Sequence, residues 1–120
     1  MKNVPLSQLA QTVGAEVGET VRAVKIELFN GVIRDTRVDK GRLRGNWQTS
    51  TGSPKLTEIE RTDTSGAEAM AEVAENVTAD GEDYLTNNLT YAAVWEERDG
   101  MIARNVARIE RNIRERVREQ

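Results

Sequence analysis

The 120-residue sequence contains no cysteine and no histidine. Without cysteine, the chain has neither disulfides nor thiolate metal sites. Without histidine, it lacks the commonest general base and the commonest transition-metal ligand. Aromatic residues are also scarce, with one Phe, two Trp and two Tyr. A chain of this length forms one modest core. We therefore predict that residues 1–120 form a single domain, and that partner chains supply part of its burial.

Long apolar runs are also missing from the sequence. No stretch approaches the roughly 18 consecutive apolar residues that a membrane-spanning helix needs. The first residues, Met1 to Pro5, lack the apolar core of a signal peptide. These absences predict a protein that is made and kept in a cytoplasm, with no membrane partner.

The charges are unevenly distributed along the chain, whose net charge is −3. Residues 37–61 carry six basic and three acidic residues, whereas residues 62–98 carry one basic and nine acidic residues. Residues 1–36 are balanced, and residues 99–120 carry six basic and four acidic residues. Charge layout affects association more than fold. Opposite zones therefore predict contacts between copies, and a solvated surface without a partner is the alternative.

Apolar spacing predicts a long helix at each end of the chain. Apolar residues recur every three or four positions over residues 5–34, which is the pattern of one helix face. Pro5 suits the first turn of that helix because its missing N–H has no partner there. Residues 101–119 form a second amphipathic helix, with a stripe made of Ile102, Val106, Ile109, Ile113 and Val117.

Shorter elements lie between these two helices. Ser65 followed by Glu68 is a capping-box pattern that marks the start of a helix. The predicted elements are a strand over 47–50, a strand over 55–62, a helix over 65–77, a strand over 83–89 and a short helix over 91–97. This order predicts an α+β fold, in which the long N-terminal helix and the C-terminal helix pack on a small antiparallel β-sheet and a short helix is inserted.

Groups that could carry chemistry are few. Asp80, Glu82 and Asp83 could bind a hard cation, but they lack the spacing of a calcium loop, so we predict an exposed acidic turn. Glu96 and Glu97 are adjacent on a helix and diverge, so they do not form an acid–base pair. The sequence also has no P-loop and no serine elbow. No catalytic, cofactor-binding or metal site is predicted, and we expect the protein not to be an enzyme.

The C-terminal helix is rich in arginine, which raises the question of nucleic-acid binding. Its six arginines are interspersed with Glu110, Glu115 and Glu119, and the whole chain is acidic. A DNA-binding helix is usually more purely basic. Pairs such as Glu110 with Arg114 predict a salt-bridged outer or interface face. DNA contact without sequence preference is the alternative.

The most distinctive stretch runs from Arg37 to Trp47 with the sequence RVDKGRLRGNW. Asp39 can cap a short helical turn, and Gly41 permits the chain to bend. Leu43 and Trp47 are then expected to anchor the stretch to the core. Arg42 and Arg44 are expected to stay free for a partner's carboxylates. A basic connector between helix and strand is the simpler alternative.

This stretch resembles the Pro-Val-Asp-Thr-Gly-Arg-Leu-Arg signature of phage neck and tail-completion proteins, a tail-component family of long-tailed phages and prophages. In that family a long helix precedes the signature and a strand opening with Ser-Trp or Asn-Trp follows it. A second signature has a strand ending in Asn, then Tyr-Ala and a Glu, then Gly-Met, an Arg and an amphipathic helix. The matching residues are Asn87 to Ala93, Glu96, and Gly100 to Arg104.

The chain departs from the family pattern at two places. Arg37 and Lys40 stand where the family has Pro and Thr. The Gly-Ser-x-Gln-x-Pro stretch that the family has between Glu96 and Gly100 is reduced here to Glu97-Arg98-Asp99. The resemblance implies that this loop contacts neighbouring subunits in an oligomeric ring. Its shortening therefore bears on which partners the chain contacts.

The resemblance implies a structural virion protein of the head–tail joint, without a cofactor, that forms a homo-oligomeric ring. Such a ring completes or terminates the tail and joins it to the head. The implied partners are copies of itself, head-closure or connector proteins, and tail-tube or tail-terminator proteins. Genome DNA is expected to pass through the lumen without specific binding. Six copies are expected, with twelve as the alternative, in the tail or neck of a virion assembled in the host cytoplasm.

The alternative in a different class is an adaptor protein of prophage origin that binds another protein without forming a ring.

In a head-to-tail ring, the acidic zone of one copy can meet the basic zone of the next. The candidate oligomer and partner interface residues are Asp39, Arg42, Arg44, Glu72, Glu75, Asp80, Glu82, Asp83, Tyr91 and Glu96.

Overall fold

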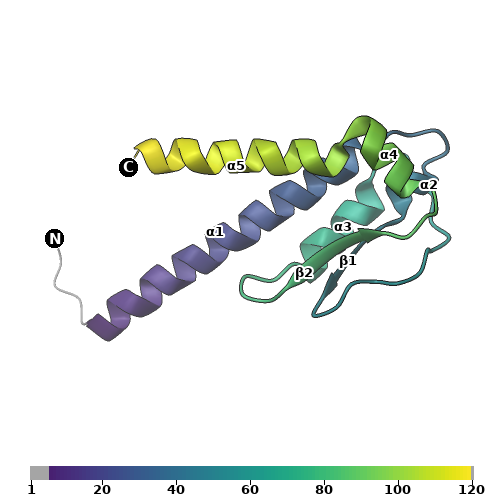
Figure 1. Cartoon of the computed structure of the whole chain (residues 1–120). Coiled ribbons are helices and arrows are strands. Elements are labelled where there is room, and N and C mark those ends of the chain that lie inside the picture. The colour runs from purple at the N-terminus through teal and green to yellow at the C-terminus, as the bar shows by residue number, and fades with distance from the viewer. Residues whose placement is uncertain (1–5, 120) are drawn as a thin grey trace.

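The computed structural model describes the backbone of residues 6–119 and the side chains of residues 18–118. The described elements, in chain order, are α1 (Leu6–Asp35), α2 (Arg42–Gly45), β1 (Trp47–Thr51), α3 (Ala67–Asn76), β2 (Asp83–Asn87), α4 (Ala92–Asp99) and α5 (Met101–Glu119) (Figure 1). This order confirms the predicted α+β class, with a long helix at each end and a helix inserted between two strands.

The two strands form an antiparallel pair, with Trp47 opposite Asn87 and Thr51 opposite Asp83. Helix α3 contacts both β1 and α1, so it connects the sheet to the long helix. Helix α5 begins near the C-terminal end of α1 and contacts it, and the two helices then diverge along their length (Figure 1). The far parts of α1 and α5 therefore extend beyond the body that holds the sheet.

The core lies where α1, α3, β1 and the start of α5 meet. Its buried residues are Phe29, Val32, Ile33, Trp47, Ala69, Val73, Val77 and Met101. Fully burying a large apolar side chain contributes about 1.5–3 kcal/mol. The predicted stripe of the first helix thus reaches the core at its C-terminal end. The side chains of its first members, Leu6, Leu9, Val13 and Val17, lie outside the described residues.

Helix α5 approaches α1 closely at Gly31. A Cβ atom at Gly31 would collide with the side-chain oxygen of Asn105 and would lie 2.7 Å from a guanidinium nitrogen of Arg108. Asn105 is buried and donates its amide to the Asp35 carboxylate at 2.9 Å and to the Met101 carbonyl at 2.7 Å. A glycine within a helix costs up to about 1 kcal/mol relative to alanine. The absence of a side chain at Gly31 allows the two helices to contact each other.

Residues 55–62 do not form the predicted strand. Leu56 is 83% exposed, so the apolar alternation there has no core to face. The segment is held by side-chain hydrogen bonds instead. The Gln48 amide donates to the Thr57 carbonyl at 2.8 Å, and the Asn46 side-chain oxygen accepts from the backbone N–H of Ile59 at 2.8 Å. The prediction was wrong because side chains from β1 and its approach satisfy this backbone.

Helix α3 confirms the helix predicted over 65–77, but its start differs from the capping box expected at Ser65 and Glu68. Gly66 precedes the helix with a φ of +82°, which favours glycine. The buried Asp63 carboxylate accepts from the backbone N–H groups of Gly66 at 3.0 Å and Ala69 at 2.9 Å. Asp63 therefore serves the free N–H groups at this helix start, where negative charge is also favoured.

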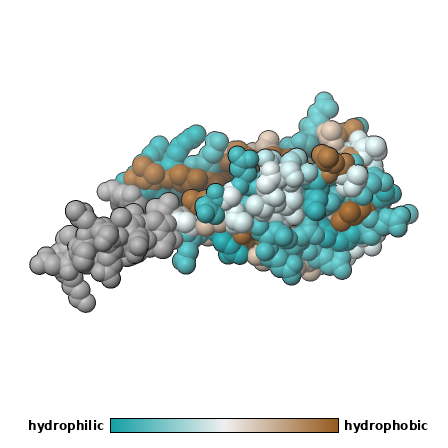
Figure 2. Space-filling view, turned by 90° about the horizontal axis from the view of Figure 1, so that it is seen from below, coloured by the Kyte–Doolittle hydropathy of each residue, from teal (hydrophilic) through white to brown (hydrophobic). Residues whose placement is uncertain are grey.

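The surface carries a band of exposed apolar residues. Figure 2 shows hydrophobic surface at the end of the molecule where α5 extends, next to hydrophilic side chains. The exposed apolar residues of α5 are Ile102, Val106, Ile113 and Val117. Grouped exposed apolar side chains mark interaction surfaces.

Candidate assembly interface

The stretch from Arg37 to Trp47 is built into the fold. Gly41 has a φ of +85°, and its carbonyl accepts from the N–H groups of Gly45 and Asp63, both at 2.9 Å. Gly41 itself precedes the α2 turn, which has no side-chain cap, so the expected capping role of Asp39 is wrong. Leu43 and Trp47 are buried, which confirms that they anchor the stretch.

The prediction that Arg44 stays free for a partner is wrong. Its guanidinium donates to the carbonyl of Arg34 at 2.8 Å, to that of Thr36 at 2.7 Å and 3.2 Å, and to that of Thr64 at 2.6 Å. The last carbonyls of a helix have no intrahelical partner. The planar guanidinium has several donors in a fixed geometry and suits such a cluster of acceptors. Arg44 therefore joins the end of α1 to the loop before α3.

Arg42 differs from Arg44 although it lies in the same turn. Its guanidinium is 3.2 Å from the Glu58 carboxylate, and both side chains are about half exposed. An exposed ion pair of this kind contributes about 0–1 kcal/mol. Arg42 can therefore exchange Glu58 for a partner's carboxylate at little cost.

Asp83 is buried and satisfied within the chain. The Lys25 ammonium lies 2.9 Å from its carboxylate, which also accepts from the hydroxyl of Thr51 at 2.6 Å and from the N–H and hydroxyl of Thr78, both at 3.0 Å. Burial acts to raise the pKa of Asp83, but these hydrogen bonds outweigh it and lower the pKa to about 2. Asp83 therefore stabilises the fold, and its side chain is not accessible to a partner.

Replacing Asp83 by asparagine is expected to lower the free energy of unfolding by about 1.5–3 kcal/mol at pH 7. The folded-state pKa lies below the ordinary value of 3.8, so this stability is present above about pH 4 and is lost as the pH falls toward 2. Urea unfolding of both proteins at pH 7 and pH 3 measures the effect. The difference between them should shrink at pH 3, and an equal difference at both values would contradict the role of this carboxylate.

Two more acidic candidates are also occupied inside the chain. Glu72 accepts from the backbone N–H of Thr49 at 2.9 Å and pairs with Arg61 at 2.8 Å. Glu96 accepts from the N–H groups of Ile102 at 2.8 Å and Ala103 at 3.2 Å, so it caps the start of α5. Sequence reasoning missed these roles because both carboxylates accept from backbone N–H groups that only folding brings close.

Three of the candidates, Asp39, Arg42 and Tyr91, line one surface hollow of about 470 Å³, which we call the signature pocket. Its other lining residues are Arg37, Val38, Lys40, Leu43 and Trp95. Val38 and Tyr91 are about 40% exposed, so the pocket combines accessible apolar and charged groups. The structure therefore brings together candidates that lie about 50 residues apart in the chain.

Arg37 forms one wall of the signature pocket. Its guanidinium lies 3.7 Å from the centroid of the Trp95 ring and binds both carboxylate oxygens of Asp99, at 2.7 Å and 2.8 Å. The hydrogen bond from Arg37 lowers the pKa of Asp99. Sequence reasoning missed this contact, although Arg37 and the shortened loop ending in Asp99 are both departures from the family pattern.

Three exposed acidic candidates remain on the surface, namely Glu75, Asp80 and Glu82. Among the described residues, none of them forms an ion pair with a basic side chain. The Glu82 carboxylate accepts from the Tyr84 hydroxyl at 3.0 Å, and this bond raises the pKa of Tyr84. These carboxylates are therefore available to cations from another chain.

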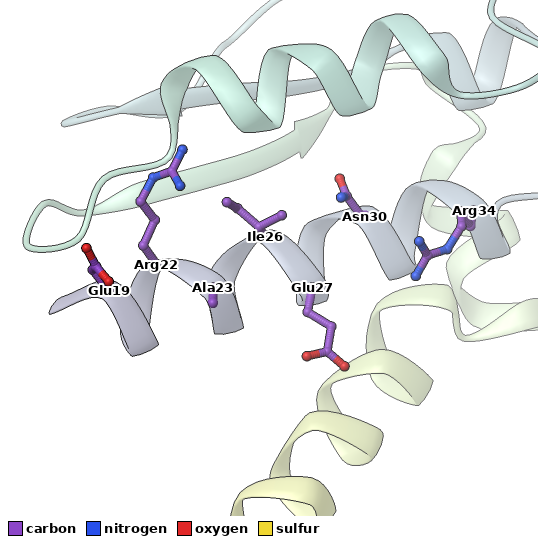
Figure 3. Close-up of a pocket in the computed structure, with 7 residues that line it drawn as sticks. All are labelled: Glu19, Arg22, Ala23, Ile26, Glu27, Asn30 and Arg34. Carbon is purple, nitrogen blue, oxygen red and sulfur yellow. The ribbon is translucent and has the colours of Figure 1, made fainter. Parts of the chain in front are cut away.

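A larger hollow of about 620 Å³ lies along α1 and is lined by Glu19, Arg22, Ala23, Ile26, Glu27, Asn30 and Arg34 (Figure 3). Arg22 points toward α3 and donates to the carbonyls of Ala74 at 2.9 Å and Val77 at 3.1 Å. Glu27 points toward α5 and pairs with Arg108 at 3.1 Å. These side chains join α1 to its neighbours and do not converge on a ligand position.

Comparison with family models, curated proteins and solved structures finds no match to this chain. Within the part of the chain that the structure describes, no three or more Asp and Glu side chains are grouped to hold a metal ion. No described helix has the length and apolar character to cross a membrane.

Proposed function

We propose that the protein is a structural component of the head–tail joint of a tailed bacteriophage. In this proposal, copies of the chain form a ring that completes or terminates the tail and joins it to the head. The ring contacts head-closure or connector proteins on one side and tail-tube or tail-terminator proteins on the other. Six copies are expected, and genome DNA passes through the lumen without specific binding.

The observation that carries this proposal is the contact between the two signature segments. The side-chain amide of Asn87 donates to the Leu43 carbonyl at 2.8 Å across 44 positions of the chain. Leu43, Leu89 and Ala92 are buried together in one apolar cluster. Trp47 lies opposite Asn87 in the antiparallel sheet, so the pairing of β1 with β2 also holds the two segments together. Their contact therefore supports the interpretation that both segments are parts of one motif.

The rest of the second signature forms the turn between α4 and α5. Gly100 has a φ of +62°, and its N–H donates to the Glu96 carbonyl at 2.8 Å. The Glu96 side chain then caps α5. A glycine in the left-handed region and an acidic cap suit this sharp reversal. The residue types in this signature thus have a structural reason for their spacing.

The two departures from the family pattern contact each other. Arg37 replaces a proline, and it binds Asp99 of the shortened loop in a two-point contact. Trp95 stacks beneath the guanidinium at 3.7 Å. The pair joins the two signature segments at the place where the resemblance implies a longer loop.

Electron microscopy of the purified protein tests the ring, and deletion of the gene from a phage that encodes the chain tests the joint. We expect ring-shaped particles with a six-fold image average. We also expect the deletion to yield filled heads and free tails that do not join. A copy of the gene supplied in trans should restore joined virions and serves as the control.

Two results would contradict the proposal. Joined virions formed without the protein would exclude a necessary role at the head–tail joint. Single copies that bind another protein one-to-one, with no rings at any concentration, would favour the adaptor of prophage origin.

A further inference from the structure

An apolar groove of about 200 Å³ opens on the surface between α1, β2 and the start of α5. Its apolar lining consists of Leu28, Phe29, Val32, Leu85, Ile102 and Val106. Tyr84 also lines the groove, and its hydroxyl bonds to the exposed Glu82 carboxylate. We call this feature the α5 groove, and it has an apolar floor with an acidic group at its rim.

Helix α5 carries an apolar stripe that continues beyond this groove. Ile102, Val106, Ile113 and Val117 are 41%, 38%, 44% and 66% exposed. At 100° per residue these four positions fall within one narrow face of the helix. Ile109 is buried, which marks the side of α5 that packs inward. Ile113 and Val117 belong to the C-terminal half of α5, which diverges from α1 (Figure 1), and the described residues leave both side chains exposed.

The charges of α5 complement the acidic rim of the groove. Residues 101–119 include six arginines and three glutamates. Among the described residues, Arg108 pairs with Glu27 and Arg114 pairs with Glu110, while Arg116 forms no ion pair. Helical geometry places Arg116 beside the Ile113 stripe.

Two copies of α5 packed on each other would bring basic surfaces together. A symmetric contact between the two helices is therefore disfavoured. Docking of α5 on an acidic rim is favoured instead, and that contact is head-to-tail, because it joins two different surfaces of the chain.

We infer that the α5 groove of one copy binds the C-terminal half of α5 from a second copy of this chain. Ile113 and Val117 of the second copy cover the apolar floor, and Arg116 meets Glu82. The inference rests on the proposed function and deepens it, since repeated head-to-tail contacts of this kind close a ring when the rotation permits. In this inference, α5 supplies the basic side chains of the contact in place of Arg42 and Arg44.

Substitution of Ile113 by aspartate tests the apolar half of this contact, and Ala107→Asp is the matched control. Both residues are exposed on α5, but Ala107 lies on the face away from the stripe. Sedimentation velocity over a concentration series is expected to show about tenfold weaker self-association for Ile113→Asp. Ala107→Asp should assemble like the original protein, and circular dichroism should show that both variants are folded.

A charge exchange tests the charged half of this contact. Arg116→Glu and Glu82→Arg are each expected to weaken self-association about tenfold, because like charges then face each other. The double variant, carrying both changes in one chain, should regain most of the loss since the pair is reversed. A merely structural role for either residue would leave the double variant no better than the single ones.

The outcomes separate this inference from the proposed function. Unchanged assembly of Ile113→Asp, equal loss in Ala107→Asp, or a wild-type chain that stays monomeric at every concentration would overturn the contact. Joining of tails to heads in the deletion phage tests the proposed function by itself. Head-to-tail assembly through this groove together with normal joining in the deletion phage would keep the inference and reject the phage role.

Discussion

Replacing Trp47 by alanine is expected to lower the free energy of unfolding by about 3–5 kcal/mol, the usual cost of removing a buried tryptophan. Trp47 is 3% exposed and lies in the cluster that joins α1, α3, β1 and the start of α5. Its indole N–H donates to the Thr36 hydroxyl at 2.7 Å, and that hydroxyl donates to the Val32 carbonyl at 2.7 Å. Domain stabilities are only about 5–15 kcal/mol, so the variant loses a large share.

Urea unfolding followed by circular dichroism measures this loss. Trp47→Phe is the matched control, because it keeps an aromatic ring in the core and removes the hydrogen bond to Thr36. It should cost about 1–2 kcal/mol, from the lost bond and the smaller ring. A loss below 1 kcal/mol for Trp47→Ala would show that this side chain does not hold the core together.

Replacing Arg44 by alanine is expected to lower the free energy of unfolding by about 1.5–3 kcal/mol. The change leaves the carbonyls of Arg34, Thr36 and Thr64 without the charged donor that now joins them. The end of α1 would then separate more easily from the loop before α3. Thermal unfolding should show a clear fall in the midpoint, whatever the oligomeric state.

Arg42→Ala is the matched control because Arg42 lies in the same turn and carries the same charge. Its exposed pair with Glu58 predicts a loss below about 1 kcal/mol. Arg44→Lys should recover only part of the Arg44→Ala loss, since an ammonium lacks the planar donors that reach all three carbonyls. Equal losses for Arg42→Ala and Arg44→Ala would contradict the structural role of Arg44.

The basic zone over 37–61 and the acidic zone over 62–98, which are predicted to meet between copies, also meet within one chain. Arg61 of the first zone pairs with Glu72 of the second at 2.8 Å within one chain, with both side chains largely buried. Part of the complementarity is therefore used in folding. The exposed charges that remain for assembly include the carboxylates of Glu75, Asp80 and Glu82, the guanidinium of Arg42, and Arg116 of α5.

Apolar periodicity determined the long helices because a helix repeats its faces over many turns. The predicted ranges 5–34 and 101–119 match α1 and α5 closely. The β-strand beginning at Trp47 and the break at Gly100 were also readable from local pattern, since each depends on neighbours in the chain. The α+β class follows from that order of elements.

Tertiary structure alone decided which polar groups are free. Arg42 and Arg44 look equivalent in sequence, yet the first lies at the surface and the second binds the carbonyls of Arg34, Thr36 and Thr64. The strand expected over 55–62 is absent because the side chains of Asn46, Gln48 and the distant Asn88 satisfy part of its backbone. Periodicity reports which face of an element is apolar, but hydrogen-bond partners depend on the packing of segments far apart in the chain.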